Sequence, residues 1–411
     1  MPFSPCQEEA FKLLTQSSDN VFLTGRAGTG KSHLIREFIR TKDSKKFPVV
    51  ASTGAAAVLV RGRTIHSFFG LGILQGGVEQ AVEEARKNRR VLSRLKGIDG
   101  LVIDEISMVP KNVLQAAERV ARMARENTRA WGGLRVIAVG DFAQLPPIDR
   151  HSPEKPWAFQ DEVWDQTQFQ PALLKTMIRT TDNEFLRVLN LVRLGVVNEE
   201  VEYYLNRKIT SEYEIPHDVP RLYARKAPVE EHNLSKLSEI KQDLHEFPTE
   251  YTGKGGALEQ IKKNAPVPEV LQIKKNALVM IRVNDPEMKY FNGSLGSVVG
   301  ISEDELQIEL KSGREVEISK ESFSYLDADG NEAAVAKNFP ISLAYATTIH
   351  KSQGATLDSM VCDLRRLWEP GQAYVALSRL RSGSGLHLLG WDRSSIKVSP
   401  EVMAFHRSLV S

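Results

Sequence analysis

The chain has almost no cysteine and no long hydrophobic run. Cys6 and Cys362 are the only cysteines in 411 residues, which excludes a disulfide framework and a cysteine-based metal cluster. No apolar stretch approaches the ~20 residues that a membrane-spanning helix needs. The first residues also lack the basic start and apolar core of a signal peptide. We therefore expect a reducing, cytoplasmic setting and no membrane partner.

An excess of one charge sign is absent as well. The 54 basic and 52 acidic residues leave a net charge of +2, which excludes the strongly basic signature of a protein that coats nucleic acid. This balance does not exclude a narrow basic channel, because basic and acidic residues can lie on different faces of a protein. The hydrophobic share of 41% and the charged share of 26% are typical of a soluble globular protein. The length favours two or three domains.

The first third of the chain alternates short apolar runs with helical patterns. Buried strands are predicted at residues 21–24, 49–52, 100–104 and 134–139, and helices at residues 32–40 and about 114–124. This alternation predicts an α/β fold with a parallel, doubly wound sheet and helices on both of its faces.

The rest of the chain changes character twice. Prolines break the alternation from residue 144 to about residue 169, before a predicted helix at residues 183–194 and a strand at residues 221–224. Further short strands are separated by Gly, Asn and Asp turns, and they lie at residues 278–281, 296–299, 306–310 and 316–318. This pattern predicts a small antiparallel barrel at about residues 273–337, inserted into a second α/β domain.

A phosphate-binding loop follows the first predicted strand. Its residues are Gly25, Arg26, Ala27, Gly28, Thr29, Gly30, Lys31 and Ser32. The glycines let backbone N–H groups close around phosphates, Lys31 would neutralise the β and γ oxygens, and Ser32 would place its hydroxyl on Mg²⁺. The alternative is a plain glycine-rich turn. A strand before the loop and a helix after it are the context that the phosphate-binding motif requires.

Two carboxylates end the third buried strand. Asp104 would hold Mg²⁺ through its water shell, and Glu105 would polarise the attacking water as a general base. By itself, an Asp-Glu pair is more often a solvated turn. Because it follows four apolar residues in a chain with a phosphate loop, we assign it to the nucleotide site.

Gln144 and two arginines are candidates for contact with the γ-phosphate. Gln144 follows the next buried strand and would report whether that phosphate is present, although a loop that merely ends a strand is an equal alternative. Hydrolysis builds charge on the γ-phosphoryl oxygens, which an arginine from outside the first domain would stabilise. Arg179 and Arg379 lie outside it, but a single arginine is more often a surface charge.

These motifs, in this order, resemble the superfamily-1B DNA helicases, and within them the PIF (petite integration frequency) family and its RecD-like relatives. The resemblance runs nearly from end to end. It is carried by Gln7, residues 25–32, 52–57, 64–68, 104–108, 131–134, 140–147, 292–296, 347–354 and 373–379. The last two segments, with the phosphate loop, point to this one branch rather than to kinases or GTPases.

The resemblance implies two RecA-like domains. Domain 1A would span residues 1–172 with a wedge-like 1B insertion at about 61–98, and domain 2A would span residues 173–272 and 338–411, with an SH3-like β insertion, 2B, at 273–337. The resemblance also implies ATP with Mg²⁺, and 5′-to-3′ movement on single-stranded DNA and its junctions with duplex. A monomer would suffice, acting in replication, repair or recombination, at the nucleoid if the source is prokaryotic.

The resemblance also assigns site residues. Catalytic roles go to Lys31, Glu105, Gln144, Arg179 and Arg379. ATP binding goes to Gln7, Gly25, Ala27, Gly28, Thr29, Gly30, Lys31, Ser32 and Gly354, and metal binding to Ser32 and Asp104, partly through water. DNA binding goes to Thr53, Gly54, His66, Ser67, Phe68, Thr348, His350 and Lys351.

A motor that ignores base sequence should hold phosphates and stack on bases. His66, Phe68, His350 and Lys351 suit that task, although a core position suits Phe68 equally well. A basic run without an acid consists of Arg86, Lys87, Arg89, Arg90, Arg94 and Lys96. Such runs are more often solvated helix faces; our hypothesis is that this one guides the duplex or the displaced strand.

Several other functions compete with an ATP-dependent DNA helicase. A DNA-stimulated translocase without strand separation and an RNA helicase would use the same motifs. A phosphoryl-transfer kinase would need a small-molecule pocket and no second arginine-bearing domain. A non-enzymatic, ATP-gated binding module would not need Lys31, Glu105 and Gln144 together. Preference for forks, four-stranded guanine structures or RNA–DNA hybrids cannot be read from the sequence.

Overall fold

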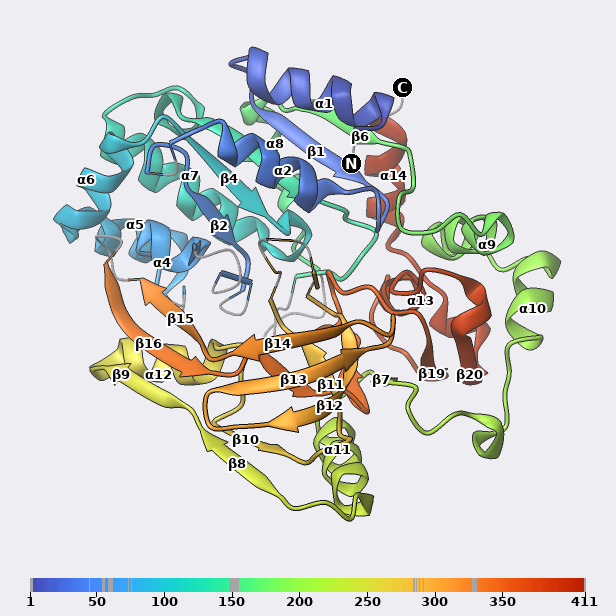
Figure 1. Ribbon diagram of the computed structural model, residues 1–411. Helices are drawn as coiled ribbons and strands as arrows, with labels where there is room; N and C mark the ends of the chain where they lie inside the picture. The colour runs from blue at the N-terminus through green and yellow to red at the C-terminus, as the bar shows by residue number, and fades with distance from the viewer. Residues whose placement is uncertain are drawn as a thin grey trace. The chain divides into compact units, whose positions relative to one another are not determined.

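The computed structural model divides the chain into two compact units (Figure 1). Unit 1 comprises Met1–Ile178, Tyr325–Ala333 and Pro400–Ser411, and unit 2 comprises Arg179–Ser324 and Ala334–Ser399. The structure describes residues 3–43, 45–53, 56–57, 62–72, 74, 76–147, 155–283, 285, 287, 289–290, 292–326 and 331–409. Within these residues, no helix has the length and apolar character to cross a membrane.

Unit 1 is built on a six-stranded sheet whose order is β3-β2-β4-β5-β1-β6. Every neighbouring pair is parallel, with Val21 opposite Ile137 where β1 meets β5. The strands are β1 (Val21–Gly25), β2 (Val49–Ala51), β3 (Arg63–Thr64), β4 (Gly100–Asp104), β5 (Arg135–Gly140) and β6 (Gln170–Leu174). The central strands are continuous apolar runs because helices cover both faces of a parallel sheet. The predicted strands and the parallel sheet are confirmed.

The first helix of unit 1 begins at a local sequence signal. Pro5 starts the first helix, and Ser4 and Gln7 form a capping box around its amino end. The helices are α1 (Pro5–Gln16), α2 (Lys31–Arg40), α4 (Ile65–Phe69), α5 (Gly77–Lys87), α6 (Arg89–Gly97), α7 (Lys111–Arg125), α8 (Glu162–Thr167) and α14 (Pro400–Ser408), with short 3₁₀ helices η1 (Ile106–Met108), η2 (Ala130–Gly133) and η3 (Ala158–Gln160).

The connection from α7 to β5 is a buried turn. Trp131 has a positive φ of 56°, and its backbone N–H donates to Glu118 Oε1 at 3.1 Å. The indole Nε1 of Trp131 donates to Thr167 Oγ1 at 2.9 Å. The Trp-Gly-Gly segment therefore joins α7 to α8 beneath the sheet edge, and its described contacts are structural.

Unit 2 contains a smaller parallel sheet, in the order β18-β7-β19-β20. Its strands are β7 (Arg221–Tyr223), β18 (Ala346–Thr348), β19 (Met360–Leu364) and β20 (Leu386–Trp391). Its helices are α9 (Asn183–Arg193), α10 (Glu199–Asn206), α11 (Ala227–Glu239) and α13 (Gln372–Leu377), with η4 (Glu212–Glu214), η5 (Gly383–Gly385) and η6 (Arg393–Ser395). The predicted second α/β domain is confirmed by this sheet.

The chain between β7 and β18 carries the antiparallel part of unit 2. A five-stranded sheet has the order β14-β13-β12-β11-β17. Its strands are β11 (Leu278–Ile281), β12 (Leu295–Ile301), β13 (Glu305–Leu310), β14 (Glu315–Ser319) and β17 (Ile341–Leu343). Flanking elements are β8 (His245–Pro248), β9 (Glu250–Gly253), α12 (Gly255–Asn264), β10 (Val270–Ile273), β15 (Glu321–Leu326) and β16 (Glu332–Asn338). Alternating burial along β13 and β14 shows one face on the core.

Two predicted boundaries differ from the structure. The antiparallel five-stranded sheet runs from β11 to β17, and the bounds of the insertion at residues 273–337 stay a prediction, because β8 pairs with β10 in a separate sheet. Unit 1 runs to Ile178 rather than to residue 172, because β6 pairs with β1 and is followed by residues of the same unit. The prediction that α14 belongs to the second domain is wrong, because Phe405 packs on Phe159 at 4.4 Å between ring centroids, within unit 1. The barrel closure and the wedge role stay predictions.

Candidate nucleotide and DNA sites

The phosphate loop of unit 1 is a tight turn between β1 and α2. Gly28 and Gly30 have φ values of 85° and 86°, in the left-handed region that favours glycine. A Cβ on Gly30 would lie 2.5 Å from Gln7 Nε2, and a Cβ on Gly25 would lie 2.5 Å from the Leu174 carbonyl oxygen. The loop therefore needs its glycines both for backbone conformation and for space.

Lys31 lies at the first turn of α2, inside the curve of the loop. Its Nζ donates to the carbonyl oxygens of Gly25 at 2.8 Å and Arg26 at 3.2 Å. Ser32 follows it and is exposed. An ammonium group, a hydroxyl and the positive end of a helix dipole thus face the same small region, which is the arrangement that binds phosphate.

Gln7 ties α1 to the phosphate loop. Its side chain is buried, Nε2 donates to the Thr29 carbonyl oxygen at 3.1 Å, and Oε1 accepts from the Ser4 backbone N–H at 3.0 Å. Both ends of the amide therefore have protein partners in this structure. Contact of Gln7 with an adenine stays a prediction.

Asp104 and Glu105 form the turn at the carboxyl end of β4. Asp104 Oδ1 accepts from the Glu105 backbone N–H at 3.0 Å. Burial raises the pKa of Asp104, while this hydrogen bond and the nearby charge of Lys31 oppose the shift. Glu105 has φ 53° and ψ 47°, a strained conformation for a residue with a side chain. Strain of this kind is concentrated at functional sites.

The loop after β5 is the third segment of the candidate nucleotide site. Asp141 is buried, its Oδ1 accepts from the Ala143 N–H at 3.2 Å, and its carbonyl oxygen accepts from the Gln144 N–H at 2.9 Å. Gln144 is 5% exposed. Because β5 lies between β4 and β1 in a parallel sheet, the phosphate loop, the carboxylates and this loop lie at one carboxyl edge. Open α/β sheets bind their ligands at such an edge.

Arg179 and Arg379, 200 residues apart, lie together in unit 2. Arg179 Nη1 donates to the carbonyl oxygen of Ser378, and burial and the charge of Arg379 lower the pKa of Arg179 to about 9. Arg379 is 1% exposed. Its guanidinium donates to Val375 O at 2.8 Å, Ser378 Oγ at 2.8 Å and Ser352 O at 3.3 Å. Two like charges are thus held together by neutral oxygen acceptors.

The predicted DNA-binding residues of unit 1 fall into three groups. Gly54 lies outside the described residues. Thr53, His66 and Ser67 are half-buried, and burial lowers the pKa of His66. Phe68 takes the core position, which is the equal alternative to stacking on a base. Its ring is 3% exposed, because it packs on Phe69 and is covered by the guanidinium of Arg94, 4.8 Å from its centroid.

In unit 2, the predicted residues follow β18. Thr348 Oγ1 accepts from the Lys351 N–H at 3.0 Å and shapes the turn. Burial lowers the pKa of half-buried His350. Lys351 is exposed, and desolvation together with the charges of Lys226 and Arg282 lowers the pKa of its ammonium. Gly354 has φ 80° and open space at its Cβ position; its role in ATP binding stays a prediction.

Lys226 and Arg282 are candidates that the sequence did not reveal. Lys226 precedes α11 and Arg282 follows β11, and neither belongs to a motif. Only the fold brings them near Lys351. Lys226 also pairs with Glu230 at 3.0 Å, so three cations and one carboxylate share this neighbourhood and leave a local excess of positive charge, although the net charge of the chain is almost zero.

The basic run at residues 86–96 has local partners. Arg94 donates to the Phe68 carbonyl oxygen. Lys96 pairs with Glu126 at 2.7 Å, and Arg86 is 3.6 Å from Glu83. These contacts support a solvated helix face. Guidance of a duplex by the remaining charges stays a hypothesis.

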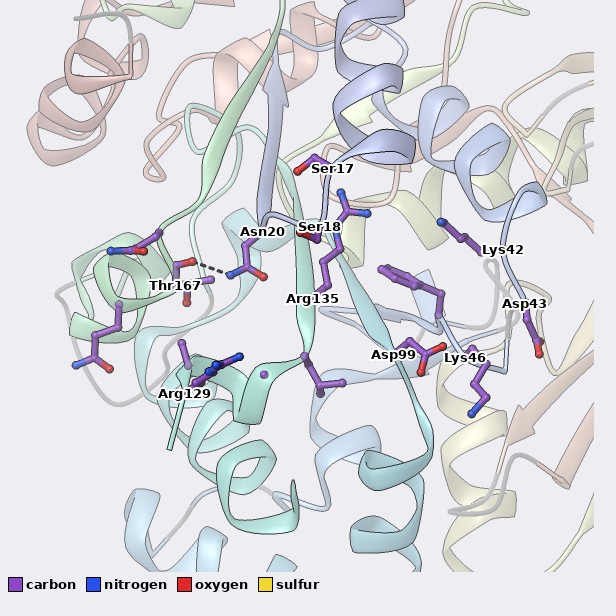
Figure 2. Close-up of a pocket in the computed structure, with 16 residues that line it drawn as sticks. Ser17, Ser18, Asn20, Lys42, Asp43, Lys46, Asp99, Arg129, Arg135 and Thr167 are labelled. Atoms are coloured by element: carbon purple, nitrogen blue, oxygen red, sulfur yellow. Dashed lines mark hydrogen bonds between the residues drawn. The ribbon is translucent and has the colours of Figure 1, made fainter. Parts of the chain in front are cut away.

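A cleft of about 790 Å³ lies at the opposite, amino edge of the unit 1 sheet (Figure 2). Asn20, Asp99 and Arg135 line it just before, or at the start of, strands β1, β4 and β5. Arg135 donates to the carbonyl oxygens of Leu13, Leu14 and Asp19, and Asn20 donates to the Thr167 carbonyl oxygen at 2.7 Å. These bonds hold α1 and α8 to the sheet, and no predicted site residue lines the cleft.

Comparison with known proteins identifies similar sequences and folds. The model of the PIF1-like helicase family matches residues 4–202. The "ATP-dependent DNA helicase Pif1" of Bdellovibrio bacteriovorus is 50% identical over 98% of this chain and 91% of its own length. A crystal structure of Pif1 helicase from Candida albicans matches with a TM-score of 0.80 and 34% identity, over 100% of both chains.

A third match was solved with ligands. The crystal structure of Pif1 helicase from Bacteroides in complex with ADP-AlF3 and single-stranded DNA has a TM-score of 0.66 and 29% identity. It covers 99% of this chain and 97% of the Bacteroides chain. Because the similarity extends over nearly the whole length of both chains, it includes both units and not only the phosphate loop.

Proposed function

This chain belongs to the PIF1-like helicase family and is an ATP-dependent DNA helicase, and we propose that it moves 5′ to 3′ along single-stranded DNA into a junction with duplex. The observation that carries the proposal is the gathering of three loops at one sheet edge of unit 1. The phosphate loop, Asp104 with Glu105, and the loop of Gln144 follow β1, β4 and β5 there.

Lys31 and the loop backbone bind the triphosphate in this proposal. The ammonium of Lys31 exchanges the carbonyl oxygens of Gly25 and Arg26 for phosphate oxygens, which are stronger acceptors because they are charged. Gly25 and Gly30 keep the loop tight, because a Cβ at either position would meet Leu174 or Gln7.

Ser32 and Asp104 fit a magnesium site. The Ser32 hydroxyl is exposed, and Asp104 is a buried carboxyl whose ionised form a cation would favour. When bound, Mg²⁺ neutralises charge on the β- and γ-phosphate oxygens. Asp104 contributes the carboxylate oxygen and Ser32 the hydroxyl oxygen.

Glu105 and Gln144 act on the water and the γ-phosphate. Glu105 accepts a proton from the attacking water, and its left-handed backbone fixes the direction of its side chain. Gln144, held by Asp141, reports on the γ-phosphate. We assign to Arg179 and Arg379 the stabilisation of charge that develops on the γ-phosphoryl oxygens, because two adjacent guanidiniums suit an anion.

The DNA strand is held mainly by its phosphates. In unit 2, Lys351, Lys226 and Arg282 supply positive charge, and His350 lies in the same loop as Lys351. In unit 1, Thr53, His66 and Ser67 supply polar groups, while Phe68 contributes packing. Contacts of this kind do not read base sequence, which suits a motor that must move over any strand. One copy of the chain suffices.

The decisive experiment measures unwinding on duplexes that carry either a 5′ or a 3′ single-stranded tail, made of DNA or RNA. We expect ATP-dependent unwinding of DNA with a 5′ tail, and ATP hydrolysis that rises when single-stranded DNA is added. Unwinding from a 3′ tail would reject the direction. ATP hydrolysis with movement but no strand separation would indicate a translocase, and preference for RNA tails would indicate an RNA track.

A further inference from the structure

The last helix of the chain, α14, contacts two elements of the nucleotide site of unit 1. Unit 2 ends at Ser399 and unit 1 resumes at Pro400, so α14 begins where the chain returns from unit 2. Phe405 and His406, on the same helix, make these contacts. None of the helicase motifs includes either residue, and the function proposed above does not use them.

Phe405 lies in an aromatic cluster with residues that precede or follow the catalytic loops. Its ring centroid is 5.9 Å from that of Phe22, three residues before Gly25 on β1, and 5.4 Å from that of Phe142. It also stacks on Phe159 at 4.4 Å with an interplanar angle of 11°. The helix is therefore packed against both β1 and the loop after β5.

His406 reaches the carboxylate that shapes the glutamine loop. His406 Nε2 is 3.6 Å from Asp141 Oδ1, and Asp141 is 0% exposed. The same oxygen accepts the Ala143 N–H, and the Asp141 carbonyl oxygen accepts the Gln144 N–H. A change in the position of the Asp141 side chain would therefore alter the turn that presents Gln144.

We propose that His406 is a positioning residue for ATP hydrolysis. By contacting Asp141, it fixes the conformation of the turn that carries Gln144. Because α14 follows the chain segment that arrives from unit 2 through Ser399, the position of His406 depends on that segment. The inference rests on the proposed function, because it takes Gln144 to act on the γ-phosphate. His406 itself touches neither nucleotide nor DNA.

The test compares three variants of the full chain, His406→Ala, His406→Gln and Arg407→Ala. In His406→Ala, kcat of DNA-stimulated ATP hydrolysis should fall roughly 10- to 100-fold, with KM for ATP unchanged within about twofold, because a misplaced catalytic group costs rate. His406→Gln should restore most of kcat, since its amide N–H can donate to Asp141. Arg407→Ala is the matched control, because Arg407 is exposed on the same helix.

Two outcomes would overturn the positioning role. One is a wild-type kcat in His406→Ala. The other is an equal loss in His406→Ala and His406→Gln, accompanied by a lower melting temperature, which would indicate packing alone. Asp141→Asn supplies a second measurement. Its effect and that of His406→Ala should combine less than additively if the two residues act as a pair, and full additivity contradicts the proposal.

A linker insertion tests the dependence on unit 2. Three Gly or Ser residues inserted between Ser399 and Pro400 should leave ATP hydrolysis without DNA unchanged and reduce its stimulation by single-stranded DNA several-fold. The control is the same insertion after Gly313, an exposed turn between β13 and β14. Intact stimulation would reject this part of the inference. A wild-type chain without DNA-stimulated hydrolysis would instead reject the proposed function.

Discussion

Each unit carries a parallel sheet, and the predicted site residues gathered around the two sheets differ in chemistry. In unit 1, glycines with positive φ, one lysine and two carboxylates lie at the carboxyl edge of β1 and β4. In unit 2, the described candidates are cations or neutral groups, with Arg179, Arg379 and Lys351 foremost. The carboxylates to which we assign metal binding and water activation belong to unit 1, and the cations of unit 2 have the charge that suits phosphates.

The comparison also separates two ways of holding a cation. Lys31 donates to loop carbonyls that phosphate oxygens can replace. Arg379 is buried and donates to acceptors of its own unit, and Arg179 lies beside it with a lowered pKa. The Lys31 ammonium of unit 1 can thus exchange its acceptors for phosphate oxygens, whereas the two arginines of unit 2 place two positive charges side by side. Variants of each set should have effects of different kinds.

The largest effect is expected in unit 1. Lys31→Ala should lower ATP hydrolysis by about 1,000-fold or more and abolish unwinding, because the variant loses its phosphate-binding charge in a site that works by positioning and electrostatics. DNA binding should be retained, since the cations of unit 2 are unchanged. Steady-state ATPase and DNA-binding titrations measure both. Substantial residual hydrolysis would reject the assignment of this loop.

The next effect is expected in unit 2. Arg179→Ala should lower kcat for ATP hydrolysis roughly 100- to 1,000-fold with a small change in ATP affinity, because the arginine acts on charge that develops in the transition state. Arg381→Ala is the matched control, an exposed arginine nearby that is 3.3 Å from Asp358. Equal kcat values for the two variants would show that Arg179 is structural.

Charge around Lys351 should affect DNA affinity rather than hydrolysis. Lys351→Ala should weaken binding of single-stranded DNA several-fold for every base sequence. It should also reduce the slope of log affinity against log salt concentration by about one, as expected for the loss of one phosphate contact. Lys226→Ala should act in the same direction, because Lys226 lies close enough to shift the pKa of Lys351. Affinity measured over a range of salt concentrations decides this, and an unchanged salt slope would contradict it.

The smallest effect concerns pH. Burial lowers the pKa of His350 from its usual value of 6.5, so the folded state favours the neutral imidazole. Acidification through that range should therefore destabilise unit 2 slightly, because the unfolded chain binds the proton more readily. Protonated His350 would also add charge to the DNA site and tighten binding. His350→Gln should reduce both pH dependences, and a pH profile identical to that of the wild type would exclude His350.

Much of the molecule follows from local patterns. The central strands β1, β2, β4 and β5 of the unit 1 sheet are apolar runs typical of the interior of a parallel sheet, and the phosphate loop lies where the strand-loop-helix pattern places it. The edge strands β3 and β6 carry polar residues and have no such signal. Local patterns do not predict contacts between residues that are far apart in the chain. Phe68 is an apolar residue at the end of the motif at residues 64–68, and its burial under Arg94 depends on α6. Helix α14 has no sequence signal for the unit that it joins.

The sequence by itself determined the chemistry, because glycine conformations, the Lys31 ammonium and the paired carboxylates are properties of short segments. It also determined the order of strands and helices along the chain. Only the tertiary structure decided which distant groups meet. Arg179 with Arg379, Lys351 with Lys226 and Arg282, and His406 with Asp141 are each far apart in the chain. Strand order and the return of the chain to unit 1 bring them together, and neither is encoded in any local pattern of residues.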